Sequence, residues 1–151
     1  METVTHDMVV LRQTVKFYEL CLEEIRHRHD LTKLEIVVIS FLANDPEKDS
    51  VAEIAEERML SRGNVSRGAD SLCRRGLLER VPDTLDRRLV HLRLLPAAEP
   101  ILREVWGAME GFQAQLFKGF TPEEKRAFDH LRDKIADNIV QGQERGAMRH
   151  G

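Results

Sequence analysis

Residues 50–76 read SVAEIAEERMLSRGNVSRGADSLCRRG, and this stretch predicts two short helices joined by a tight turn. Ser50 and Glu53 have the spacing of a capping box, which marks the start of the first helix. Ser61 can cap the second helix, residues 62–75, and Gly76 is the residue type expected in the left-handed position after a helix. The stretch therefore predicts a helix-turn-helix.

The pattern changes after Gly76, where apolar residues begin to alternate with polar ones. Residues 77–81 and 89–95 are predicted to be strands, because alternation is typical of a strand with one buried face. The intervening loop, residues 82–88, carries the pair Arg87 and Arg88. The sequence thus predicts a β-hairpin with an arginine-tipped loop, a wing beside the helix-turn-helix.

Helices are predicted on both sides of this winged helix-turn-helix, from the spacing of apolar residues and from capping motifs. Apolar residues at steps of three and four predict a helix over residues 4–28, and Thr32 with Glu35 predicts a capped second helix that ends near Asn44. A fifth helix is predicted from Pro96, and a sixth after the capping box of Thr121 and Glu124, with residues 142–151 frayed beyond it.

The predicted fold is mainly α with a small β-hairpin: a winged helix-turn-helix with N- and C-terminal dimerisation helices. We expect one domain over residues 1–151. Residues 31–95 would form the winged lobe, and residues 4–29 and 96–145 the helical dimerisation lobe. The apolar stripes at both ends of the chain are too extensive to be buried on one small winged lobe, which favours a homodimer.

Positive charge is concentrated in the same region. Residues 58–93 hold nine arginines, no lysine and four acids, whereas the whole chain has a net charge of −3. The planar, always-charged guanidinium suits phosphates and guanine edges. Since the chain as a whole is acidic, we expect a localised nucleic-acid site and not a general polyanion coat.

A helix-turn-helix places its second helix in the major groove of DNA, N-terminal end first. The face of residues 62–75 that lies opposite the apolar stripe of Val65, Ala69 and Leu72 is therefore the candidate reading surface. An arginine inserted in the narrow minor groove gains most from its negative potential, and Asp86 can orient such an arginine through a bidentate pair. The candidate DNA-binding residues are Ser61, Arg62, Asn64, Ser66, Arg67, Asp86, Arg87 and Arg88.

Several short motifs together resemble the MarR (multiple antibiotic resistance regulator) family. They are Leu31-Thr32 with Glu35, Ile54-Ala55-Glu56, Leu60-Ser61, Val65-Ser66-Arg67, Leu72, the run from Gly76 to Arg80, and Asp86-Arg87-Arg88. The resemblance covers about residues 10–145. It implies an obligate homodimeric transcription factor whose recognition helix reads the major groove and whose wing arginine, matching Arg88, enters the minor groove.

The resemblance also implies a function and shows one departure. Many members are repressors released by small, often phenolic, ligands bound between the dimer helices and the winged domain. Phe17, Tyr18, Trp106 and Phe112 could line such a pocket for a small aromatic or amphipathic effector, although core packing is the more common role of such aromatics. Here Leu94-Leu95-Pro96 stands where the family usually has Leu-Thr followed by glycine, so the fifth helix lacks the usual threonine cap.

Other classes of function find little support in the sequence. No nucleophile elbow, phosphate loop or paired metal motif is present, so we expect neither an enzyme nor a cofactor. No apolar run has the length of a membrane span, and Cys21 and Cys73 have no metal spacing, so we expect a cytoplasmic protein with reduced thiols. Two alternatives stay open: a winged-helix interaction module without DNA binding, and a zinc-responsive regulator that uses some of the six histidines.

Overall fold

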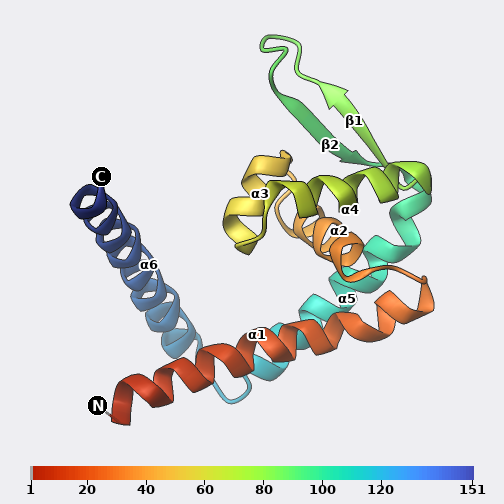
Figure 1. The fold of residues 1–151 in the computed structure, drawn as a ribbon. Helices are drawn as coiled ribbons and strands as arrows, with labels where there is room; N and C mark the ends of the chain where they lie inside the picture. The colour runs from red at the N-terminus through yellow and green to blue at the C-terminus, as the bar shows by residue number, and fades with distance from the viewer. Residues whose placement is uncertain (1) are drawn as a thin grey trace. The chain divides into compact units, whose positions relative to one another are not determined.

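The computed structural model describes residues 2–151 and is helical apart from one hairpin (Figure 1). The hairpin is antiparallel, as the alternating pattern predicted. In chain order the elements are α1 (Glu2–Arg28), α2 (Lys33–Asn44), α3 (Val51–Arg58), α4 (Arg62–Arg74), β1 (Leu78–Pro82), β2 (Val90–Leu94), the 3₁₀ turn η1 (Pro96–Ala98), α5 (Glu99–Leu116) and α6 (Pro122–His150). This order confirms the predicted winged helix-turn-helix fold.

The chain divides into two compact units. The first ends at Phe112 and contains α1 to β2 and most of α5, and the second is Gln113–Gly151. The hydrophobic core lies in the first unit, where α2, the most apolar helix, is buried along most of its length. Ile39, Ile54, Val65, Leu72 and Val105 are fully buried or nearly so, and they come from α2, α3, α4 and α5.

The helix starts follow the predicted caps, with one difference. Thr32 and Thr121 form full capping boxes with Glu35 and Glu124. At α3 the hydroxyl of Ser50 accepts the backbone N–H of Glu53, but the Glu53 carboxylate accepts from that same hydroxyl at 2.8 Å and not from the Ser50 backbone. The predicted box at Ser50 is therefore wrong in its second half, because the side chain of the cap competes for the carboxylate.

The wing follows α4 through Gly76, which has a φ of +73° and ends the helix as predicted. Strands β1 and β2 pair in antiparallel register from Leu78 opposite Leu94 to Pro82 opposite Val90. The inner residues Leu78 and Leu92 are buried and tie the base of the hairpin to the core, while its loop extends away from α2 to α4 (Figure 1).

The second unit differs from the prediction at its end. Helix α6 continues to His150, so the expectation that residues 142–151 are frayed is wrong. None of the α6 side chains is buried, and Phe128, Leu131, Ile135 and Ile139 are 39–60% exposed on one face. Near the start of α6, Phe117, Phe120 and Phe128 pack edge to face. No helix in the described part of the chain combines the length and apolarity needed to cross a membrane.

Candidate nucleic-acid interface

Helix α4 is held against α2 by a face of small and apolar residues. Val65, Ala69 and Leu72 have no exposed surface, as the i, i+4, i+7 spacing predicted. Gly68 lies so close to α2 that a Cβ atom there would stand 3.2 Å from both Cβ and the carbonyl oxygen of Leu34. The absence of a side chain at Gly68 thus lets the two helices approach, and it fixes which face of α4 turns outward.

The outward face presents the N-terminal half of α4 to solvent. Ser61 caps the helix by accepting the backbone N–H of Asn64 at 3.1 Å, and Arg62 and Arg67 are exposed. Arg67 donates to the side-chain oxygen of Asn64, so these two predicted reading groups are held together on one surface. Arginine and asparagine can each make bidentate contacts to a purine edge, and a helix start attracts phosphate.

Ser66 occupies a different environment from the other candidates. Arg80 on β1 donates to its hydroxyl at 3.2 Å and to the Asp70 carboxylate at 2.7 Å. The side chain of Ser66 therefore lies at the junction between α4 and the wing. Arg80, which the sequence did not single out, links the two elements and sets their relative placement.

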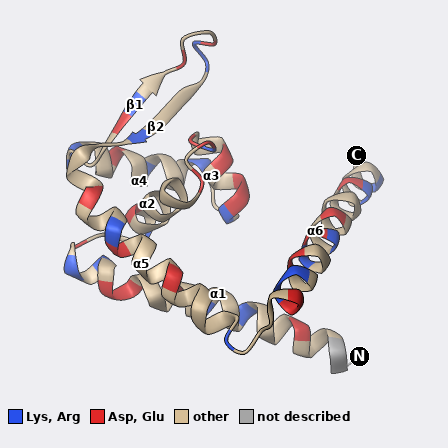
Figure 2. Ribbon diagram, turned by 180° about the vertical axis from the view of Figure 1, so that it is seen from behind, with Lys and Arg blue, Asp and Glu red and all other residues tan. Residues whose placement is uncertain are grey.

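Aspartates organise the loop of the wing. Asp83 accepts the backbone N–H groups of Leu85 at 2.9 Å and Asp86 at 2.8 Å, which closes the turn. Asp86 holds Arg88 by its backbone N–H at 3.0 Å and by its guanidinium at 3.2 and 3.4 Å, the bidentate pair that the sequence predicted. Arg87 and Arg88 are exposed, and Figure 2 shows basic residues at this end of the hairpin.

Four of the nine arginines have a partner on another element of the fold. The guanidinium of Arg58 lies 5.3 Å from the ring centre of Tyr18 and donates to its hydroxyl. Arg75 donates to the backbone carbonyls of His29 and Asp30 and to the Glu35 carboxylate. Arg80 is paired with Asp70, and Arg93 lies 3.8 Å from Glu79. The remaining five are exposed, and in the described structure none of them has a hydrogen-bond or ion-pair partner on another element: Arg62, Arg67, Arg74, Arg87 and Arg88.

Glu35 is the buried carboxylate of this region, with only 2% of its surface exposed. It accepts the Thr32 backbone N–H at 2.9 Å and the Ser71 hydroxyl at 3.2 Å in addition to Arg75. Burial of the carboxylate acts to raise the pKa of Glu35, but the hydrogen bonds from Thr32 and the charge of Arg75 outweigh it, and the pKa lies below its usual value. Glu35 thus joins α2 to the end of α4 as an ionised group.

His91 is a second organising residue that the sequence did not identify. Its ring nitrogens lie between two carboxylates, 2.8 Å from Asp49 before α3 and 2.7 Å from Asp83 at the wing loop. These hydrogen bonds, with Asp49 the larger contributor, raise the pKa of His91 above its usual value, and the pKa of Asp83 falls to about 2, chiefly through His91. The only available signal was the alternation of His91 with apolar residues on β2.

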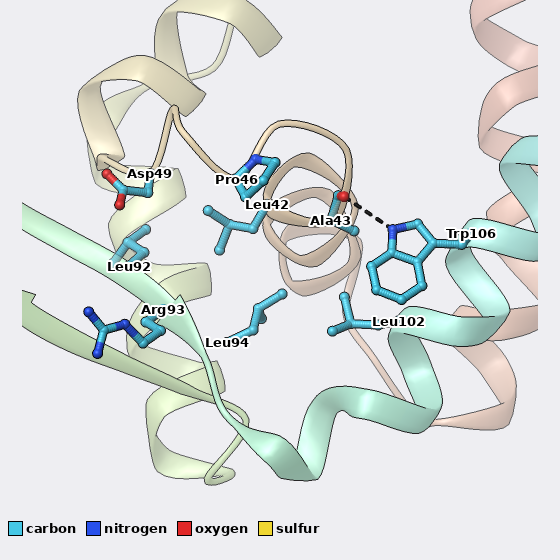
Figure 3. A pocket seen from close by; sticks show the side chains of 9 residues that line it. All are labelled: Leu42, Ala43, Pro46, Asp49, Leu92, Arg93, Leu94, Leu102 and Trp106. Carbon is cyan, nitrogen blue, oxygen red and sulfur yellow. Dashed lines mark hydrogen bonds between the residues drawn. The ribbon is translucent and has the colours of Figure 1, made fainter.

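The four predicted pocket aromatics separate into two groups. Phe17, Tyr18 and Phe112 pack together, with Tyr18 and Phe112 edge to face at 5.6 Å between ring centres. Trp106 lines a different space, a cavity of about 300 Å³ between α2, β2 and α5, and its indole N–H donates to the Ala43 carbonyl at 3.1 Å. Figure 3 shows Asp49 and Arg93 at the end of this cavity away from Trp106; the rest of the lining is apolar.

The two histidines at the end of α1 and just after it have carboxylate partners, and neither cysteine forms a disulfide. His27 lies beside Glu23, and His29 pairs with Glu104 on α5, where Arg28 also binds. Cys21 and Cys73 are free and half-buried. Within the residues that the structure describes, no group of three or more His, Cys, Asp or Glu side chains is arranged to hold a metal ion.

Comparison with known proteins identifies the same region. Residues 29–89 match the model of the MarR family. YsmB of Bacillus subtilis (strain 168), an uncharacterized HTH-type transcriptional regulator, is 28% identical over 106 residues, which cover 70% of this chain and 72% of YsmB.

Solved structures extend the likeness to most of the chain. A MarR-family transcriptional regulator from Silicibacter pomeroyi has a TM-score of 0.72 at 23% identity, with 86% of this chain and 87% of that protein covered. BpsR of Bordetella bronchiseptica, whose DNA binding is regulated by 6-hydroxynicotinic acid, has a TM-score of 0.62 at 23% identity, over 89% and 98% of the two chains. Matches at this level of identity show the fold. Residues 29–89 are therefore similar to the MarR family, whose members are transcription regulators and not enzymes, and the chain around them has the fold of a MarR-family regulator.

Proposed function

We propose that this chain is a homodimeric, sequence-specific DNA-binding regulator, a repressor that a small amphipathic effector releases from a pseudo-palindromic operator. The observation that carries the proposal is the sorting of the arginines. Four of them, Arg58, Arg75, Arg80 and Arg93, have partners on other elements, whereas those at the start of α4 and at the wing tip are exposed and are bonded at most to a neighbour on their own element. Of these exposed guanidiniums, Arg67 is bonded to Asn64 on its own helix and Arg88 to Asp86 in its own loop. Exposed guanidiniums that are not tied to another element can turn to phosphates and base edges.

The two exposed groups have different roles in this proposal. Arg62, Asn64 and Arg67 lie on the first turns of α4, the part of a recognition helix that reaches base edges. Arg87 and Arg88 extend from the hairpin loop, from which they can enter the adjacent minor groove. Ser61 supplies a phosphate contact at the helix start, Asp86 orients Arg88, and Ser66 contributes through the junction with Arg80.

The homodimer is supported by apolar surface that the single chain leaves exposed. On α1, Val4, Met8, Leu11 and Val15 are 49–67% exposed at steps of four, three and four residues, and α6 carries the similar exposed stripe described above. Exposed apolar stripes of this extent mark association surfaces. Each leucine or isoleucine that becomes fully buried contributes about 1.5–3 kcal/mol. We therefore place both terminal helices in one dimerisation lobe of a single MarR-like domain.

Sedimentation tests the dimer directly. We expect a particle of twice 17.4 kDa at micromolar concentration. Ile135→Asp, on the apolar stripe of α6, should dissociate it, whereas Asp137→Ala, on the opposite side of the same helix, should not. A particle of 17.4 kDa for the wild-type chain would contradict the dimer.

The cavity at Trp106 supports the effector part of the proposal. At about 300 Å³ it lies at the lower end of the range of small-molecule sites, and it touches α2, the wing strand β2 and α5. A ligand there would alter how the wing packs on the helices. Because Trp106 is the single tryptophan of the chain, its fluorescence reports occupancy. Titration with benzoate and with 6-hydroxynicotinic acid, the compound that regulates BpsR, should quench or shift that emission if aromatic acids enter.

The central test is DNA binding, measured by fluorescence anisotropy with the DNA upstream of the chain's own gene. Arg67→Ala should weaken specific binding by about tenfold or more and leave binding to scrambled DNA almost unchanged. Arg88→Ala should weaken binding to both and lower the salt slope by about 1. Arg103→Ala, an exposed arginine of α5, is the matched control. Unchanged affinity in both variants would overturn the site, and no binding at low salt would favour an interaction module.

A further inference from the structure

The imidazole of His91 joins the wing to the helix-turn-helix. Its Nδ1 lies 2.8 Å from a carboxylate oxygen of Asp49, and its Nε2 lies 2.7 Å from a carboxylate oxygen of Asp83. The three side chains come from different parts of the first unit: the loop before α3, the strand β2 and the loop of the wing. The three side chains are 23–35% exposed. We refer to this arrangement as the His91 clasp.

The geometry of the His91 clasp requires a proton. Carboxylates only accept hydrogen bonds, and a neutral imidazole has one N–H donor and one lone pair. Both short distances can therefore be hydrogen bonds only when the ring carries N–H on both nitrogens, as the imidazolium. On loss of that proton, a lone pair would face a carboxylate oxygen, and one side of the clasp would open.

Each carboxylate of the clasp is tied to a functional part of the fold. The second oxygen of Asp83 accepts the backbone N–H groups of Leu85 and Asp86 and so shapes the loop that carries the wing arginines. The carbonyl of Asp49 accepts the backbone N–H of Leu92 at 2.8 Å, and Asp49 precedes Ser50, the cap of α3. The clasp thus spans from the wing tip to the start of the helix-turn-helix.

Other charged groups near the clasp are engaged elsewhere. Lys48, next to Asp49, binds Glu57 and Asp45, and Arg93, two residues along β2, lies beside Glu79. In the described chain, the hydrogen-bond and ion-pair partners of the His91 ring are the two aspartates alone. The two carboxylates therefore set the charge state of the ring, in the sense that favours the imidazolium.

We propose that protonated His91 is a positioning residue for DNA binding: it fixes the wing loop against the helix-turn-helix, and the wing loses this placement as the pH rises and the ring loses its proton. The proposal rests on the proposed DNA-binding function. It makes the proton a ligand of the regulator, because the state with bound proton is the one that presents Arg87 and Arg88 in a fixed position.

The first test needs no DNA. NMR of the wild-type chain between pH 5.5 and 8.5 should show His91 titrating above the ordinary midpoint of about 6.5. In the same pH range the amides of Leu85 and Asp86 should lose protection from hydrogen exchange, after correction for the intrinsic pH dependence of exchange. Asp83→Asn should lower the midpoint of His91. A His91 midpoint at or below about 6.5, or amide protection independent of the His91 titration, would overturn the clasp.

The second test links the clasp to DNA binding. Wild-type affinity for the upstream DNA should fall by about tenfold, the size of one lost arginine contact, as His91 deprotonates. His91→Gln should bind weakly at all pH values with a flattened profile, and His27→Gln should keep the wild-type profile. If His91→Gln fails to fold, Asp49→Asn takes its place. An unchanged pH profile in the folded variant refutes the positioning role. Absence of DNA binding at every pH, with the amides still following His91, refutes the proposed function and leaves the clasp intact.

Discussion

Replacement of Arg75 by alanine should destabilise the fold by about 2–3 kcal/mol without changing DNA affinity. The guanidinium donates to the His29 carbonyl at 2.8 Å, to the Asp30 carbonyl at 2.9 Å and to the Glu35 carboxylate at 3.3 Å. A charged hydrogen bond contributes about 1.5–3 kcal/mol, less where water can replace it. Arg75 is about one third exposed, so water would satisfy the two carbonyls in part, but Glu35, 2% exposed, would lose its counter-charge.

The backbone adds to this expected loss. Asp30 has a φ of +51°, a conformation that side-chain-bearing residues seldom adopt, and Arg75 holds its carbonyl in place. Urea unfolding at fixed protein concentration measures the free energy of unfolding. The same loss corresponds to a fall in melting temperature of about 5–10 °C for a chain of this size.

Arg74 is the matched control, since it is the adjacent arginine and lies exposed on the last turn of α4. Arg74→Ala should change the free energy of unfolding by less than about 0.5 kcal/mol. The reasoning is refuted if the Arg75 and Arg74 variants unfold at the same urea concentration. It is also refuted if Arg75→Ala weakens DNA binding at a temperature where the variant remains folded.

Three further outcomes test separate parts of the structure. Gly68→Ala should lower the free energy of unfolding by about 1–2 kcal/mol, because its Cβ would press on the Leu34 backbone. Gly63→Ala should raise it by about 0.5–1 kcal/mol, because a Cβ there would meet only the Arg67 guanidinium, at an ordinary contact distance of 3.9 Å. Urea unfolding measures both changes. The carboxyl carbon of Asp83 should titrate near pH 2 when followed by NMR. Because the pKa is lower in the folded chain than in the unfolded chain, where it lies near 4, the contribution of Asp83 to stability is complete above pH 4 and is lost as the pH falls toward 2. A midpoint near 4 would contradict the contact with His91. Trp106→Phe should lower the free energy of unfolding by about 0.5–1.5 kcal/mol through the lost bond to Ala43, again measured in urea.

The parts of the fold that the sequence predicted well depend on near neighbours in the chain. The capping pairs at Thr32 and Thr121 join residues three apart, and the turn at Gly76 depends on the conformational freedom of a single residue. Interactions of this range leave a signature in the order of residue types. The apolar stripe of α4 can be recognised from the sequence for the same reason, since the spacing of its apolar residues follows the period of the helix.

The organisation of the site depends on partners far apart in the chain, which a single sequence does not reveal. Arg75 and Glu35 are separated by 40 residues, and His91 and Asp49 by 42. Before the fold is known, nothing distinguishes the role of Arg75 from that of Arg74, and nothing indicates that His91 lies between two carboxylates. The predicted pocket combined Trp106 with Phe17 for a similar reason, since both lie on apolar helix faces. In the structure, however, the packing of α5 directs the Trp106 side chain toward the end of α2.

The same long-range pairing explains how acids can lie within a stretch proposed to face phosphates. Each of the four acids in residues 58–93 has a cationic partner: Asp70 has Arg80, Glu79 has Arg93, Asp83 has His91 and Asp86 has Arg88. A carboxylate paired with a cation presents little net charge to a third group, so these acids do not oppose an approaching polyanion. Positive charge without an acidic partner in the described structure is then concentrated on Arg62, Arg67, Arg74 and Arg87. In the described structure the pairing therefore leaves residues 58–93 with arginines that lack an acidic partner but with no acid that lacks a cationic one, while the acidic remainder of the chain discourages contact with DNA elsewhere.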